Sequence, residues 1–120
     1  MTRTLGLDFG TTNTVMALSD TGSSSHSMRF TSSAGTTDSM RTALSFMKDR
    51  GLGAAALHVE AGQAAIQQFI ENAGECRFLQ SIKTFAASSL FQGTLIYAKR
   101  QSFEDLMEVF LRKLKTYAGE

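Results

Sequence analysis

Residues 4–18 read TLGLDFGTTNTVMAL, and this stretch predicts how the fold begins. Apolar residues run or alternate on both sides of Gly10, which is typical of two strands joined by a tight bend. The predicted strands cover residues 4–9 and 14–19. An acid, Asp8, comes just before the bend, and small or polar residues follow it. A carboxylate at the junction of two apolar strands needs a chemical reason, so the bend is the first candidate site.

The overall composition limits the classes of function. The chain has 120 residues, of which 42% are hydrophobic, enough for one domain with a modest core. Its net charge is +1 and its basic residues are scattered, so we expect no nucleic-acid partner. No apolar run approaches the length of a membrane span, and no classical signal sequence is present, so we expect no membrane partner. The single cysteine, Cys76, fits a reducing compartment, which predicts a cytoplasmic protein.

Apolar periodicity predicts the remaining elements. After a turn over 19–27, we expect a third strand near 27–31, a polar loop, and a fourth strand over 43–47. The first three strands would be adjacent and antiparallel, with the fourth added to the same sheet. Later in the chain the pattern predicts a helix over 62–72 that Gly74 ends, a strand over 93–99, and a helix over 103–117 with Ser102 as its N-cap.

The bend after the first strand has the chemistry of a phosphate site. Backbone N–H groups in a tight, glycine-containing bend can converge on an anion, and threonine hydroxyls add donors without bulk. A carboxylate would repel phosphate unless a divalent cation, held through water, lay between them. Asp8 with Gly10, Thr11, Thr12 and Asn13 therefore predicts a site for nucleotide and Mg²⁺.

Similar short patterns elsewhere test how specific this one is. An aspartate-any-glycine pattern most often only forms a turn, and it recurs at residues 20–22 and 49–51. Gly-Thr-Thr recurs at 35–37, inside the predicted polar loop with no strand before it. Residues 20–24, DTGSS, resemble the catalytic turn of aspartic proteases, but one copy would have to dimerise and the following residues stay polar, so we interpret them as a turn. Only the first occurrence lies between two apolar strands.

Three segments resemble a known superfamily. Residues 6–14, GLDFGTTNT, resemble the first phosphate loop of the superfamily of actin, sugar kinases and seventy-kilodalton heat-shock proteins. Residues 78–89, FLQSIKTFAASS, and 102–118, SFEDLMEVFLRKLKTYA, resemble segments that follow in the same order in the heat-shock chaperones. The resemblance extends over nearly the whole chain and is greatest to the divergent YegD-like chaperone group.

The resemblance implies a fold, an activity and partners. The fold would be α/β, a ribonuclease H-like lobe of an actin-like ATPase, with an antiparallel β-meander followed by helices. Residues 1–120 would be the N-terminal portion of the first lobe, incomplete without the second lobe and the peptide-binding domain. The whole protein would be a heat-shock-type chaperone that hydrolyses ATP to ADP to control binding of unfolded client proteins, with co-chaperones as further partners. The chain alone would be inactive, and would self-associate through apolar surface that later segments cover.

The resemblance also implies roles for individual residues. Asp8 would hold Mg²⁺ through water, and residues 10–13 would line the β- and γ-phosphates of ATP or ADP. Lys83 would orient the γ-phosphate and the attacking water, so Lys83 and Asp8 are the expected catalytic residues. Without the resemblance, Lys83 reads as a solvated surface lysine. The chain departs from the commoner chaperones at Asn13, where they have an aromatic residue, and at residues 86–87, where Ala-Ala replaces an apolar-glycine pair.

Two rival functions share the phosphate loop. One is a filament-forming actin-like protein, and the other is a sugar kinase that transfers phosphate to a hydroxyl. The lysine segment, SIKTFAA at 81–87, favours the chaperone. The two histidines, His26 and His58, have no acid or cysteine at ligand spacing, so we expect neither to bind metal. We expect Cys76 to be structural rather than reactive.

Overall fold

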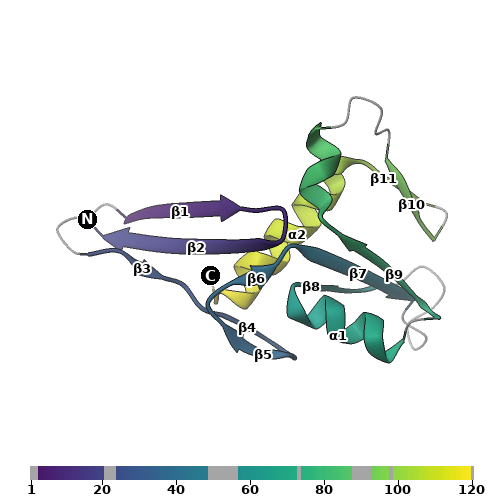
Figure 1. Ribbon diagram of the computed structural model, residues 1–120, viewed down its shortest axis with the longest axis horizontal. Coiled ribbons are helices and arrows are strands. Elements are labelled where there is room, and N and C mark those ends of the chain that lie inside the picture. The colour runs from purple at the N-terminus through teal and green to yellow at the C-terminus, as the bar shows by residue number, and fades with distance from the viewer. Residues whose placement is uncertain are drawn as a thin grey trace.

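The computed structural model describes residues 3–20, 24–48, 57–72, 74–87, 93–97 and 99–119. Within these ranges the protein is a mixed α/β structure with antiparallel sheets and two α-helices (Figure 1). The strands are β1 (Arg3–Phe9), β2 (Asn13–Asp20), β3 (His26–Ser27), β4 (Phe30–Ser32), β5 (Gly35–Thr37), β6 (Met40–Arg41), β7 (Ala43–Lys48), β8 (Leu57–Ala61), β9 (Cys76–Gln80), β10 (Thr94–Ile96) and β11 (Lys99–Gln101). The helices are α1 (Gln63–Glu71), the 3₁₀-helix η1 (Ile82–Ala87) and α2 (Phe103–Tyr117).

The first sheet is built on the β1–β2 hairpin, and it confirms the two strands predicted at the start of the chain. Seven residue pairs, from Arg3 opposite Asp20 to Phe9 opposite Thr14, form its antiparallel ladder. Two short strands, β3 and β6, both pair with β2, at its end and its beginning respectively. The predicted turn over 19–27 falls partly on residues 21–23, which lie outside the described ranges.

The predicted third strand over 27–31 is wrong as a single element. The chain forms β3, then leaves the sheet and forms β4, while the N–H of Met28 donates to the carbonyl of Met16 at 2.9 Å. The expectation of a plain polar loop is also wrong, because β4 and β5 form a small hairpin that includes the second Gly-Thr-Thr. Met28 and Phe30 are nevertheless both buried in the core, as the expectation of one shared face for these two side chains requires.

The fourth predicted strand exists as β7, but its predicted place in the first sheet is wrong. It is the centre of a second antiparallel sheet with the order β8-β7-β9. Consecutive residues 43–46 are all buried, because both faces of this strand are covered. Leu44 and Phe46 face the main core, whereas the hydroxyl of Ser45 donates to the side-chain amide oxygen of Gln68 on α1. Its partners β8 and β9 were not predicted.

The predicted strand over 93–99 is also wrong as a single element, because β10 turns back on itself into β11. Tyr97, at the turn, has a φ of 51°, in the left-handed region. Its hydroxyl reaches the second sheet and donates to the carbonyl of Phe46 at 3.1 Å or to that of Glu75 at 2.7 Å. These bonds hold the β10–β11 hairpin against the end of β7.

Both predicted α-helices are confirmed. Helix α2 begins and ends as expected, and Ser102 forms a capping box in which the N–H of Asp105 donates to the Ser102 hydroxyl at 3.1 Å. Helix α1 ends at Glu71 with Asn72 as its C-cap, before Gly74. Helix α2 contributes three buried side chains to a single core that includes residues of both sheets: Leu106, Phe110 and Leu114. Neither helix is long and apolar enough to cross a membrane.

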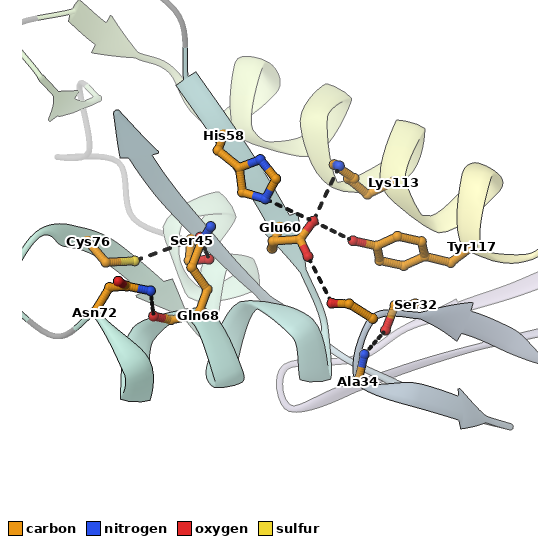
Figure 2. Close-up of polar contacts among 11 residues, drawn as sticks. Ser32, Ala34, Ser45, His58, Glu60, Gln68, Asn72, Cys76, Lys113 and Tyr117 are labelled. Carbon is orange, nitrogen blue, oxygen red and sulfur yellow. Dashed lines mark hydrogen bonds and ion pairs between the residues drawn. The ribbon is translucent and has the colours of Figure 1, made fainter. Parts of the chain in front are cut away.

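A polar network around Glu60 of β8 ties α2 to the sheets (Figure 2). Its Oε1 atom accepts a hydrogen bond of 3.2 Å from the Tyr117 hydroxyl and lies 3.7 Å from the Lys113 Nζ atom. Its Oε2 atom accepts a bond of 3.3 Å from the hydroxyl of Ser33, between β4 and β5. The carboxylate therefore connects β8, the small hairpin and the last turns of α2.

Candidate functional site

The turn between β1 and β2 is closed by a single backbone hydrogen bond. The N–H of Gly10 donates to the carbonyl of Asn13 at 3.0 Å, leaving Thr11 and Thr12 at the tip. A Cβ atom at Gly10 would collide with that same carbonyl oxygen. At Gly35, in the other Gly-Thr-Thr, a Cβ would meet nothing within 4 Å. Gly35 is favoured for another reason, its positive φ of 113°, so the two Gly-Thr-Thr segments need their glycine for different reasons.

The second sheet fixes the position of this turn. The N–H of Thr42, just before β7, donates to the carbonyl of Thr12 at 2.9 Å. The hydroxyls of Thr14 and Thr42, both fully buried, form a hydrogen bond of 2.8 Å. In Figure 1 the turn accordingly lies where β6 leads into β7. The tip of the hairpin is therefore anchored to a segment about thirty residues further along the chain.

Hydrogen-bond donors remain available at the tip. Within the part of the chain that the structure describes, no acceptor is found for the backbone N–H of Thr11 or of Thr12. Both side chains are exposed, and so is the side chain of Asn13. Backbone N–H groups and hydroxyls grouped in this way can bind an anion. An anion would displace water from them but would break no hydrogen bond among the described residues.

A polar hollow of about 20 Å³ lies beside the turn. That volume holds roughly one water molecule, so a phosphate oxygen could enter it while the rest of a phosphate group lay outside. The residues around the hollow come from the turn, from β6 and β7, from α1 and from the end of β9: Thr11, Thr12, Arg41, Thr42, Ala43, Ile66, Gln80 and Ser81. Two of the segments that carry the resemblance therefore meet at one place.

Lys83 lies close in sequence to this hollow but does not line it. Ser81 has a φ of 54°, and its carbonyl accepts hydrogen bonds from the N–H of Thr84 at 3.0 Å and from the Thr84 hydroxyl at 2.8 Å. This bend turns the chain from β9 into η1, which carries Lys83 on its exposed first turn. The Lys83 amine has no partner among the described residues. This position is compatible with a lysine that binds an anion at the hollow, and equally with an ordinary solvated surface lysine.

The register of the first sheet assigns Asp8 to a face. Asp8 pairs with Val15, and Asn13 pairs with Arg41 across the other edge of β2. Because directly opposed residues point to the same side of a sheet and alternate along each strand, all four side chains share one face. The opposite face, which includes Leu7 and Met16, is the one that α2 approaches. Asp8 is exposed, so its carboxylate is open to a hydrated cation.

No cluster of three or more potential metal-binding side chains occurs in the described ranges. A divalent cation here would depend on one carboxylate, water and the oxygens of a bound phosphate, which is how Mg²⁺ is commonly held. The fit to Mg²⁺ therefore rests on the exposed Asp8 carboxylate, which lies on the same sheet face as the side chains of Asn13 and Arg41.

Arg41 is a charged residue of this site that sequence reasoning missed. It follows buried Met40 in a two-residue strand and is exposed beside the threonine turn. Its backbone N–H donates to the side chain of Gln63 at 3.3 Å, and its guanidinium has no acidic partner in the described part of the molecule. No local pattern marks this arginine, because only the pairing of β6 with β2 brings it to the turn.

The other sequence candidates lie elsewhere. His26 and His58 are both exposed, and the Nε2 atom of His58 lies 3.9 Å from Glu60. Burial raises the pKa of the Cys76 thiol, and the neighbouring Ser45 side chain and Phe46 backbone offset this only in part, so the thiol form is favoured. Cys76 is at the start of β9, where its Sγ atom lies 3.9 Å from the Gln68 side chain (Figure 2).

No family model matches this chain, and a search of curated proteins finds no match.

Proposed function

We propose that this chain is the phosphate-binding part of a chaperone-type ATPase with a ribonuclease H-like, actin-like fold. The observation that carries the proposal is the meeting of two distant segments at one hollow. The threonine turn between β1 and β2 and the Ser81 bend that precedes Lys83 both line it. The first segment resembles the phosphate loop of the superfamily of actin, sugar kinases and heat-shock proteins, and the second resembles a segment of its heat-shock chaperones.

Each residue has a role that its chemistry supports. Thr11 and Thr12 offer backbone N–H groups and hydroxyls to the β- and γ-phosphates of ATP, and Asn13 adds a side-chain amide. When Mg²⁺ is bound, it neutralises charge on the phosphate oxygens. Asp8 holds the hydration shell of that cation. The cation in turn lies between the Asp8 carboxylate and the phosphates and reduces the repulsion between them. Lys83, a compact charge on a long stem, reaches the γ-phosphate and the attacking water as charge develops.

The proposal places nucleotide, client proteins and co-chaperones as partners of the whole protein, with ATP hydrolysis controlling client binding. The part of the chain that the structure describes offers donors on one side of a phosphate group, and within it no enclosure for a base or ribose is found near the turn. Since nucleotide affinity needs such enclosure, the chain alone should bind Mg-ATP weakly and should not hydrolyse it at a measurable rate.

The test is a titration of the ¹⁵N-labelled chain with Mg-ATP, followed by nuclear magnetic resonance, together with a phosphate-release assay. We expect millimolar binding that shifts the amide signals of Thr11, Thr12 and Ser81, with no phosphate release. An unchanged spectrum at saturating Mg-ATP would refute the proposed site. Micromolar binding with turnover would show that the chain is a complete enzyme, contrary to the proposal.

A further inference from the structure

The exposed Arg41 shares a sheet face with Asn13 and a hollow with the threonine turn. Its strand, β6, pairs with the first residues of β2, so that Arg41 lies directly opposite Asn13. Opposed residues of this kind have Cβ atoms about 5 Å apart, which brings the arginine side chain within reach of anything bound at the turn. It lines the same hollow as Thr11, Thr12 and Ser81.

We propose that Arg41 is a phosphate ligand of this site, binding the anion from the β6 side while the threonine turn binds it from the β1–β2 side. The inference rests on the proposed function because it concerns the same site. It requires that the site binds an anion, but not that the anion is ATP. The sequence patterns assigned donors at residues 10–13 and a lysine at position 83, and gave no role to Arg41.

The charges across this face support the inference. Asp8 on β1 and Arg41 on β6 are separated by β2, which places their backbones on the order of 10 Å apart. They form no ion pair with each other. The arrangement has a carboxylate at one side, a guanidinium at the other and neutral donors between them. It complements the charges of a phosphate group that has a hydrated cation at one side. The planar guanidinium can also donate two parallel hydrogen bonds to phosphate oxygens.

A purely structural role for the Arg41 side chain is disfavoured by its contacts. What holds β6 in place is its backbone, through the ladder to β2 and the bond from the Arg41 N–H to Gln63. Gln63 in turn donates to the carbonyl of Ser39 at 3.1 Å. Because none of these bonds uses the Arg41 side chain, they persist when that side chain is shortened. Substituting Arg41 should therefore leave the urea midpoint of unfolding unchanged.

The experiment compares Arg41→Ala and Arg41→Lys with a matched control, Arg29→Ala. Arg29 is also exposed and carries the same charge, but it does not line the hollow. Two probes are titrated into the 120-residue chain: sodium pyrophosphate without metal, and Mg-ATP. The signals followed are the Arg41 side-chain N–H and the amides of Thr11, Thr12 and Ser81. We expect pyrophosphate to bind, with roughly tenfold weaker affinity in Arg41→Ala, partial recovery in Arg41→Lys, and less than about twofold change in Arg29→Ala.

The outcomes separate the two proposals. Equal effects of Arg41→Ala and Arg29→Ala would overturn the inference, because net charge alone would then explain them. The absence of any pyrophosphate-induced shift at Thr11, Thr12 and Arg41 would overturn it as well. A third outcome is that the chain binds pyrophosphate through Arg41 but does not bind Mg-ATP. This result would support the anion site and refute the nucleotide function.

Discussion

The hydroxyls of Thr14 and Thr42 form a fully buried hydrogen bond of 2.8 Å that joins the first strand pair to the entrance of the second sheet. The adjacent backbone bond, from the Thr42 N–H to the Thr12 carbonyl, connects this buried pair to the tip of the turn. The position of the candidate phosphate-binding donors is therefore coupled to the packing between the two sheets.

Replacing either threonine of this pair by valine should destabilise the protein. The remaining hydroxyl would be buried without a partner, which costs about 1–3 kcal/mol, whereas the double substitution should cost less than the sum of the two. Urea unfolding of Thr14→Val, Thr42→Val and the double variant measures this coupling. Thr31→Val is the matched control, because Thr31 and Thr36 form a similar hydroxyl pair, at 3.0 Å, on the exposed β4–β5 hairpin. Additive losses in the buried pair would show that its hydrogen bond contributes nothing.

Gly10→Ala should distort the turn. The added methyl group would collide with the carbonyl of Asn13, which closes the hairpin, so we expect a loss of about 1–3 kcal/mol in stability and shifted amide signals at Thr11 and Thr12. Gly6→Ala in the middle of β1 is the control, since its Cβ would lie at an ordinary 3.9 Å from the carbonyl of Ala17. It should be neutral or slightly stabilising. If the two variants unfold at the same urea concentration, the steric argument at Gly10 is incorrect.

Asp8→Asn should change how nucleotide binding depends on Mg²⁺. With Mg²⁺ the variant should bind ATP more weakly than the wild type, because the ligand of the hydrated cation is lost. In excess chelator the order should reverse, because a repulsive charge near the phosphates has been removed. Titrations under both conditions measure the two affinities. Asp38→Asn, at an exposed position away from the hollow, controls for net charge. Weaker binding under both conditions would contradict a role for Asp8 through a metal.

The stability of the protein should fall at alkaline pH through Tyr117. Burial, followed by the negative charge of Glu60, raises the pKa of Tyr117 to about 12 from its ordinary value near 10. The folded state therefore holds this proton more tightly than the unfolded state, so the contribution is complete below pH 10 and is lost as the pH rises through 12. For a half-buried tyrosine we expect about 1 kcal/mol. Urea unfolding should show Tyr117→Phe less stable than the wild type at neutral pH, with the difference vanishing by pH 12. A constant difference would exclude this linkage.

An apolar groove of about 320 Å³ between the first sheet and α2 should make the chain self-associate. Its exposed apolar residues include Leu5, Leu7 and Leu111. Leu111→Lys should reduce concentration-dependent association in sedimentation velocity experiments. Ile70→Lys is the control, since Ile70 is 71% exposed but stands alone on α1. A monomer at all concentrations, or equal effects of the two changes, would contradict association through this groove.

The elements that local sequence predicts well are those whose signal lies within the element. In α2 the apolar spacing and the Ser102 cap are both local, and the helix forms as expected. The β1–β2 hairpin is likewise a contiguous pair of apolar strands around one bend. By contrast, β8 and β9 have five residues each and pair with β7 from distant parts of the chain. The apolar alternation at Leu57, Val59 and Ala61 is a strand signal, but it is short and does not indicate the partner strand. The same holds for the break after β3 and for the turn at Tyr97, whose hydroxyl bonds to the carbonyl of Phe46, far away in the sequence.

The sequence by itself determined the chemistry at the first bend: a glycine that the turn requires, hydroxyls and amides at its tip, and an acid on the preceding strand. Such properties depend on residue type and local order. Only the tertiary structure decided which other groups meet them, because strand register and inter-sheet hydrogen bonds act between residues far apart in the chain. The Thr12–Thr42 bond anchors the turn, the Ser81 bend brings the segment before Lys83 to the same hollow, and the pairing of β6 with β2 adds Arg41.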